Sequence, residues 1–165
     1  FDMSSLTSIY AFIFIECHNI SNINMLHNIR ELSLIGCDSI TDVSELSHIH
    51  TICLKRSKNI TDVSSLCSVN ALDISYCDNI KDVSMLSSVR ELNIYKSGVK
   101  DVGNLINLRK LVFNNNQKIY GLQFLRNLKH LHKIDTITAS LTFMKNENEQ
   151  KKLKKINKNV KIIRL

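Results

Sequence analysis

The residues that could do chemistry in this chain are five cysteines, six histidines and a series of regularly spaced aspartates. Zinc sites and redox dithiols commonly pair two cysteines across two intervening residues. No such pair occurs here, because the cysteines are Cys17, Cys37, Cys53, Cys67 and Cys77. We therefore expect reduced thiols and no metal or other cofactor. With only 4 glycines scattered along the chain, no phosphate-binding glycine loop can be drawn either.

The histidines offer one further arrangement, since His130 and His132 flank Leu131. Residues i and i+2 of a strand share a face, so the two side chains could form a metal-binding pair. The sequence supplies no third ligand at a matching spacing, which favours the alternative of solvated side chains.

The aspartates are more regular, because Asp42, Asp62 and Asp82 are 20 residues apart and Asp101 follows after 19. A ladder of stacked carboxylates could bind calcium, but calcium-binding rolls need glycine-rich nonapeptides with several aspartates per turn. A structural role is favoured instead, in which each aspartate accepts backbone N–H groups and caps a short helical turn. No nucleophile, base and orienting group stand apart from these regular positions, so the chain is not expected to be an enzyme.

The regular spacing belongs to a repeat that runs through most of the 165 residues. Its first half is a strand-like segment with apolar residues at alternate positions. The copies are Phe12-Ile13-Phe14, Leu32-Ser33-Leu34, Ile52-Cys53-Leu54, Leu72-Asp73-Ile74, Leu92-Asn93-Ile94 and Leu111-Val112-Phe113. Its second half is seen most clearly in Ile60-Thr61-Asp62-Val63-Ser64-Ser65-Leu66. One such unit cannot bury its apolar face alone, so the copies must stack into a solenoid.

The unit, L-x-L-x-x-C-x-x-I-x-D-V-S-x-L-x-x-V-x-x, resembles the leucine-rich repeat. The nearest subtypes are the short repeats of internalins and protein-phosphatase regulators, and the cysteine position is similar to that of F-box leucine-rich-repeat proteins. The I-T-D-V-S motif also looks like the repeat arrays of large DNA viruses and protists. The chain departs from internalin-type units in lacking proline. The resemblance implies an α/β fold with a curved parallel sheet on the concave face and short turns or 3₁₀ segments on the convex face.

The repeat divides the chain into an array over 1–135 and a C-terminal cap over 136–165. The array has a half repeat at 1–10, and its units start near residues 11, 31, 51, 71, 91 and 110. A degraded unit follows from 130. The cap is predicted to hold a helix within 146–159 and a final strand at 160–163. Since residue 1 falls in mid-repeat, we expect the chain to be a fragment of a longer array.

In leucine-rich repeats, the position after the strand carries an asparagine that bonds the backbone of the neighbouring turn. The resemblance therefore implies the same structural role for Cys17, Cys37, Cys77 and Asn116. Cys53 instead alternates onto the exposed strand face, which predicts that it is the most reactive thiol. The turn at Gly121 lacks the aspartate, so the solenoid is expected to loosen there.

Side chains beside the strand leucines face outward and vary freely, which predicts an extended surface for a macromolecular partner. Tyrosine and arginine are favoured anchors at protein interfaces. The predicted anchors on the concave face and its rim are Lys55, Arg56, Tyr76 and Tyr95, with Asp73, Glu91 and Asn93 as polar selectors. No small-molecule substrate is expected. The resemblance further suggests the substrate-recognition part of an F-box-type protein.

The charge of +7 is divided unevenly along the chain. Residues 1–95 hold 6 Lys+Arg and 11 Asp+Glu, which gives −5, whereas residues 96–165 hold 16 and 4, which gives +12. Binding of nucleic acid or an anionic membrane by the cap is therefore the alternative function. Its basic residues are Lys151, Lys152, Lys154, Lys155 and Lys158. The reduced-looking cysteine usage favours an intracellular, cytoplasmic location.

Overall fold

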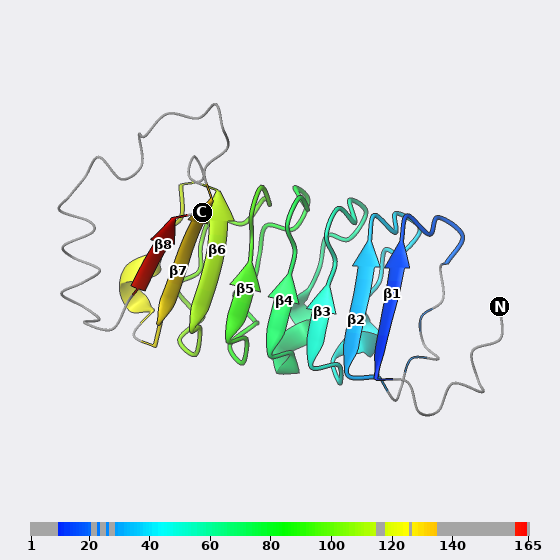
Figure 1. The fold of residues 1–165 in the computed structure, drawn as a ribbon, viewed down its shortest axis with the longest axis horizontal. Helices are drawn as coiled ribbons and strands as arrows, with labels where there is room; N and C mark the ends of the chain where they lie inside the picture. Colours follow the sequence, from blue (N-terminus) through cyan, green and yellow to red (C-terminus); the bar gives the residue numbers. More distant parts are fainter. Residues whose placement is uncertain are drawn as a thin grey trace.

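The computed structural model describes residues 10–20, 23, 26, 29–114, 118–125, 127–134 and 161–164. Eight strands form one sheet, and their order in space is their order in the chain (Figure 1). The strands are β1 (Ala11–Ile15), β2 (Glu31–Ile35), β3 (Thr51–Cys53), β4 (Ala71–Asp73), β5 (Glu91–Asn93), β6 (Lys110–Asn114), β7 (His130–Ile134) and β8 (Lys161–Arg164). Every neighbouring pair is parallel. The chain is therefore a parallel β-solenoid, as the repeat predicted.

The strand register follows the sequence repeat residue by residue. Glu31 pairs with Thr51, Thr51 with Ala71 and Ala71 with Glu91, each a step of 20 residues. Glu91 then pairs with Lys110, so the shortened step of 19 predicted from the sequence is confirmed.

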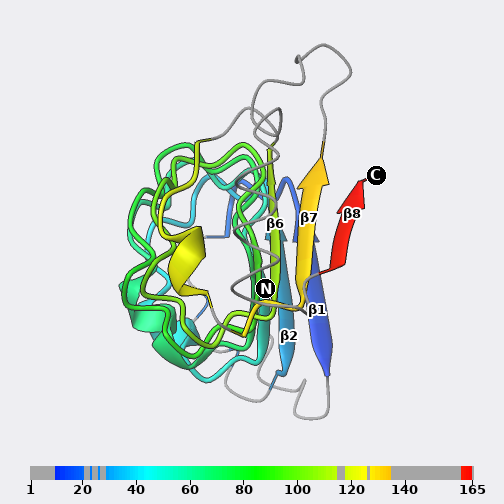
Figure 2. The same ribbon diagram turned by 90° about the vertical axis from the view of Figure 1, so that its left-hand side faces the viewer.

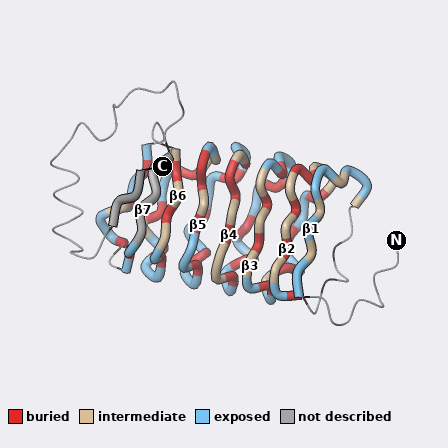
Figure 3. Tube along the Cα trace, in the orientation of Figure 1, coloured by how far each residue is buried: buried red, intermediate tan, exposed pale blue. Residues whose placement is uncertain are grey.

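The core lies between the sheet and the turns opposite it (Figures 2 and 3). Equivalent apolar side chains of successive repeats stack into buried columns. Two of these columns are Leu32, Ile52, Leu72, Leu92 and Leu111, and Leu34, Leu54, Ile74, Ile94 and Phe113. Each side chain covers the next, because neighbouring parallel strands are only about 4.8 Å apart. The hydrophobic contribution to stability thus grows with every added repeat.

Short 3₁₀ segments occupy the side opposite the sheet, which we call the turn face (Figure 2). They are η1 (Ser44–Leu46), η2 (Ser64–Ser68) and η3 (Leu122–Phe124). The described residues contain strands and 3₁₀ segments but no α-helix. The predicted cap helix lies outside these residues, as does the half repeat up to residue 9. Within the predicted cap the structure describes only β8, which covers 161–164 where a strand was predicted at 160–163 and pairs with β7.

The turn at Gly121 is tightly packed, so the expectation that the solenoid loosens there was wrong. Gly121 has φ +81°, and a Cβ added to it would lie 2.3 Å from the backbone nitrogen of Gly103. The backbone N–H of Tyr120 also donates to the carbonyl of Lys100 at 2.7 Å. A glycine replaces the capping aspartate here because the neighbouring turn leaves no room for a side chain.

Candidate protein-interaction surface

One backbone position recurs just beyond the strand ends with a conformation that ordinary residues avoid. Glu16, Gly36, Arg56, Tyr76 and Lys96, which we call the rim column, all have φ between +51° and +66°. A left-handed backbone costs a non-glycine residue on the order of 1 kcal/mol. Because the N–H groups of the first four members donate to the carbonyl of the next repeat, the solenoid itself imposes this conformation. The rim column therefore presents different side chains on one fixed and strained backbone.

The aromatic and cationic members of this region contact one another closely. The rings of Tyr76 and Tyr95 meet edge to face with centroids 5.3 Å apart. Around the Tyr76 ring lie the Lys55 Nζ at 5.8 Å, the Arg56 guanidinium carbon at 5.5 Å and the Lys96 Nζ at 5.4 Å from its centroid. The Lys96 Nζ is also 5.6 Å from the Tyr95 ring centroid. We call these five residues the rim cluster. They come from three successive repeats, and the aromatic faces attract the cations.

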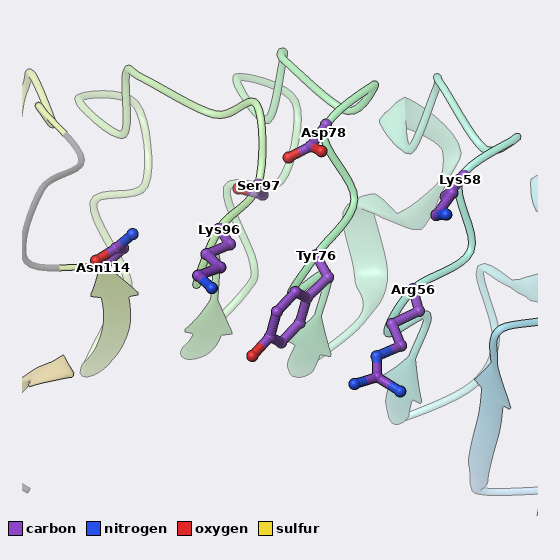
Figure 4. A pocket seen from close by; sticks show the side chains of 7 residues that line it. All are labelled: Arg56, Lys58, Tyr76, Asp78, Lys96, Ser97 and Asn114. Carbon is purple, nitrogen blue, oxygen red and sulfur yellow. The ribbon is translucent and has the colours of Figure 1, made fainter. Parts of the chain in front are cut away.

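Next to the rim cluster is an open pocket of about 570 Å³. Figure 4 shows Tyr76 projecting between Arg56 and Lys96, with three further residues above them and a fourth beyond Lys96. These four are Lys58, Asp78, Ser97 and Asn114. The pocket thus combines three cationic side chains, a phenol, a hydroxyl and an amide with a single carboxylate.

The cations of this region are not neutralised by neighbouring carboxylates. The salt bridge recorded within the described residues lies elsewhere, between the Lys110 Nζ and the Glu91 Oε2 at 3.4 Å. No carboxylate of the described chain is within salt-bridge distance of Lys55, Arg56 or Lys96. Their charge is therefore available to a ligand.

The two tyrosines differ in exposure, which changes the role predicted for one of them. Tyr76 is half-buried, whereas Tyr95 is only 9% exposed although its column was expected to face outward. Burial, with a contribution from Tyr76, raises the pKa of Tyr95. Tyr95 is thus a support against which Tyr76 packs, and Tyr76 is the accessible anchor.

The polar residues predicted as selectors lie on the sheet face, where they already have partners. The Asn93 amide donates to the Asp73 Oδ2 at 2.9 Å, and the Asp73 Oδ1 accepts the Ser75 N–H at 2.8 Å. Glu91 is held by the exposed Lys110. These residues border a hollow of about 220 Å³ between β3 and β6. A partner would therefore meet an ordered polar floor beside the rim.

The aspartates predicted to be structural make one repeated contact on the turn face. The Oδ1 atoms of Asp42, Asp62, Asp82 and Asp101 each accept, at 2.8 Å, the backbone N–H two residues ahead. The bond from the following serine lowers the pKa of Asp42, Asp62 and Asp82. These bonds to the backbone N–H two residues ahead are of the kind predicted for the aspartates, and the N-cap residues of η1 and η2 are the valines that follow Asp42 and Asp62.

The column after the strand bonds the neighbouring turn as the resemblance implied. The Cys37 Sγ, Ser57 Oγ and Cys77 Sγ donate to the carbonyls of Phe14, Leu34 and Leu54 at 3.8, 2.8 and 3.0 Å. Cys17 differs, because its Sγ contacts the carbonyl of Ile15 within its own repeat. Asn116 lies outside the described residues. Sequence reasoning missed a second set of such bonds, in which the amides of Asn59 and Asn79 donate to the carbonyls of Asp38 and Lys58.

The thiols are free, and they differ in accessibility. Cys67 on η2 is exposed, whereas Cys53 is only half-exposed and burial raises its pKa. Burial likewise raises the pKa of Cys77 to about 11. Its partial burial and raised pKa therefore argue against Cys53 as the most reactive thiol.

The structure brings together residues that the sequence placed in separate repeats. Lys55, Arg56, Tyr76 and Tyr95 were predicted and do meet, but Lys96 and Lys58 were not among the predicted site residues. The segment Lys55-Arg56-Ser57-Lys58 was the available signal, since it holds three of the six basic residues within 1–95. The basic cap residues Lys151, Lys152, Lys154, Lys155 and Lys158 lie outside the described residues.

Comparison with known proteins gives no match, either to a protein-family model or to a curated protein. Among the described residues, no helix has the length and apolar character needed to cross a membrane. No group of three or more potential metal ligands was found within the same part of the chain.

Proposed function

We propose that this chain is a non-enzymatic protein-interaction module of the leucine-rich-repeat type, which binds a partner protein through its sheet face and rim. The observation that carries the proposal is the rim cluster, in which three cations and Tyr95 surround the accessible ring of Tyr76. The family assignment is supported by the repeat unit and by its match to the strand register.

The rim cluster has the physical properties of an interface hot spot. Tyrosine and arginine bury a large area on binding and lose little rotamer freedom. Packing of Tyr76 against Tyr95 further restricts the ring before a partner arrives, which reduces the entropy cost of binding. The sheet face beside it adds polar groups that are already ordered by hydrogen bonds.

The direct test is partner capture from a cell extract with wild-type chain and the variant Tyr76→Ala. Because a hot-spot residue contributes roughly 2 kcal/mol or more, retention of the specific partner should fall by at least about tenfold. Tyr95 is unsuitable for this test, since truncating a buried ring would also disturb the fold.

The matched control is Met85→Ala, which removes a 60% exposed apolar side chain from a turn between the strands. It should leave partner capture unchanged. Equal loss from both variants, or no loss from Tyr76→Ala, would contradict the proposed surface.

A narrower form of this function is suggested by the resemblance to F-box leucine-rich-repeat proteins. Substrate recognition within an F-box-type protein is supported by the cysteine-containing repeat, and an F-box in the full-length reading frame would test it.

The charge of +12 over residues 96–165 favours polyanion binding by the C-terminal part as a second candidate function. Retention on heparin at about 0.15 M salt would support that function, and loss of all retention there would exclude it.

A further inference from the structure

The rim pocket concentrates positive charge in a part of the solenoid that is otherwise acidic. Residues 1–95 hold only 6 basic residues against 11 acidic ones. Three of those six, Lys55, Arg56 and Lys58, lie within four consecutive positions, and Lys96 joins them from the next but one repeat. The packed repeats thus create a local cationic site that the average charge conceals.

The spacing of these cations suits one compact anionic group. Neighbouring strands are about 4.8 Å apart, so Arg56 and Lys96 arise about 10 Å from each other on either side of Tyr76 (Figure 4). A group with two or three oxygens at that width can accept hydrogen bonds from the guanidinium and the ammonium together. The lining Ser97 and Asn114 bring further polar groups to the same pocket.

The surroundings argue against a long polyanion. Asp78 lines the pocket itself, and Asp73 and Glu91 border the adjoining hollow on the sheet face. A nucleic acid strand continuing past the pocket over the sheet would bring its phosphates against these carboxylates. An extended peptide with one anionic side chain in the pocket meets only the Asp78 carboxylate, and its backbone can use the polar sheet floor.

We propose that the pocket lined by Arg56, Tyr76 and Lys96 is an anion-recognition site that takes a phosphoryl or carboxylate side chain of an extended segment of the partner protein. This inference rests on the proposed function and specifies the chemistry of its anchor point. The Arg56 guanidinium supplies directional hydrogen bonds, and Lys96 supplies a point charge from the opposite side. Tyr76 orients both cations through its ring.

The backbone at this site supports a selected role for these side chains. Gly36 occupies the same rim-column position two repeats earlier than Tyr76, where the left-handed conformation is free of steric cost. Arg56, Tyr76 and Lys96 keep large side chains there in spite of the strain. Strain of this kind concentrates at binding sites, where the side chain contributes more than its backbone loses.

The experiment is a set of NMR titrations of the full chain with four probes. Three are short glycine–serine peptides whose central residue is phosphoserine, glutamate or serine, and the fourth is a short oligothymidylate. We expect amide shifts at Arg56, Tyr76 and Lys96 with the phosphoserine or glutamate peptide. The anionic peptide should bind at least about tenfold tighter than the serine peptide. The two anionic probes distinguish a phosphoryl from a carboxylate ligand.

The test variant is Arg56→Gln/Lys96→Gln, and the matched control is Lys81→Gln/Lys100→Gln, which removes two cations that are also exposed but lie outside the pocket. The test variant should weaken the anionic peptide by about tenfold or more, whereas the control should stay within about twofold. Matching circular dichroism and melting temperatures show that both variants fold.

Several results would overturn the proposal. These are tighter binding of the oligothymidylate than of either anionic peptide, shifts that map outside the rim, equal weakening by the control variant, or no preference for the anionic peptides.

Failure of the proposed function is recognised separately. If Tyr76→Ala abolishes partner capture but Arg56→Gln/Lys96→Gln does not, the interaction surface stands and the anion site falls. If the anionic peptide binds at the rim but Tyr76→Ala leaves partner capture unchanged, the anion site stands and the proposed interaction surface falls.

Discussion

The turn face and the rim of this solenoid use one repeating backbone in opposite ways. On the turn face, Asp42, Asp62, Asp82 and Asp101 make the same 2.8 Å bond in four successive repeats. At the rim, the column from Glu16 to Lys96 keeps one left-handed conformation but changes its side chain at every step. The aspartate side chains on the turn face accept hydrogen bonds from the backbone. The rim side chains only project from a backbone whose conformation is fixed.

This difference separates residues that build the scaffold from residues that are free to recognise a ligand. Replacing one of these aspartates by a residue without a side-chain acceptor leaves a backbone N–H unbonded or bonded only to water. A rim residue makes no such bond through its side chain, so any residue that tolerates the strain is compatible with the fold. Variation at a strained and fixed position is therefore the feature that marks the rim as the candidate interaction surface.

The largest expected loss of stability comes from a substitution at Gly98, two residues beyond the rim residue Lys96. Gly98 lies in the shortened repeat, and a Cβ there would be 2.2 Å from the carbonyl oxygen of Asp78 and 2.8 Å from that of Ile80. Gly98→Ala should lower the free energy of unfolding by about 3 kcal/mol, because backbone atoms must move. Gly103→Ala is the control, with its nearest contacts at 3.2 Å, and should cost much less in urea denaturation. Equal losses would show that the shortened repeat is not sterically constrained.

The next effect concerns the column that joins the rim to the core. Ser57 is fully buried and donates to the carbonyl of Leu34 at 2.8 Å. Ser57→Ala should destabilise the chain by about 1–3 kcal/mol in urea denaturation, because a buried carbonyl loses its donor. Ser57→Cys places the residue found at 37 and 77 in the same column, and it should recover part of the loss. A cysteine variant no more stable than the alanine variant would contradict the equivalence of these positions.

A smaller effect of opposite sign would break the comparison most directly. Arg56→Gly relieves a left-handed backbone at φ +63° and should raise the free energy of unfolding by up to about 1 kcal/mol. Asp62→Gly on the turn face removes a cap and should destabilise instead. Thermal melts of both variants measure the two signs. If Arg56→Gly also destabilised the chain, the rim residue would belong to the scaffold.

The smallest effect is the acid dependence of the turn face. Hydrogen bonds from backbone N–H groups lower the folded-state pKa of Asp42, Asp62 and Asp82 below that of the unfolded chain. Their contribution to stability is thus complete above about pH 4 and is lost as pH falls through the folded-state pKa. Urea midpoints between about pH 6 and pH 2.5 should decline less steeply for Asp62→Asn than for wild type. Arg56→Gln should leave that slope unchanged, and an altered slope would contradict the separation of the two faces.

Much of the fold followed from the sequence, because each repeat position has a single physical task. The strand positions, the shortened step before Lys110 and the capping aspartates were all predicted from spacing and residue type. The errors at Gly121 and Tyr95 came from contacts between neighbouring repeats. The absence of an aspartate at Gly121 does not reveal how closely the turn at Gly103 approaches it. The alternation of residues along a strand does not reveal that the Tyr95 ring packs against Tyr76.

The sequence by itself determined the solenoid. The repeat length, the alternation of apolar residues and the capping residues are local properties, and they recur along the chain. Only the tertiary structure decided which outward side chains form a site. Lys55, Arg56, Tyr76, Tyr95 and Lys96 span 42 positions of the chain, yet parallel stacking brings all three cations within 5.8 Å of one ring centroid. The physical reason is that strand spacing, about 4.8 Å, is shorter than a lysine or arginine side chain, so residues one repeat apart become neighbours.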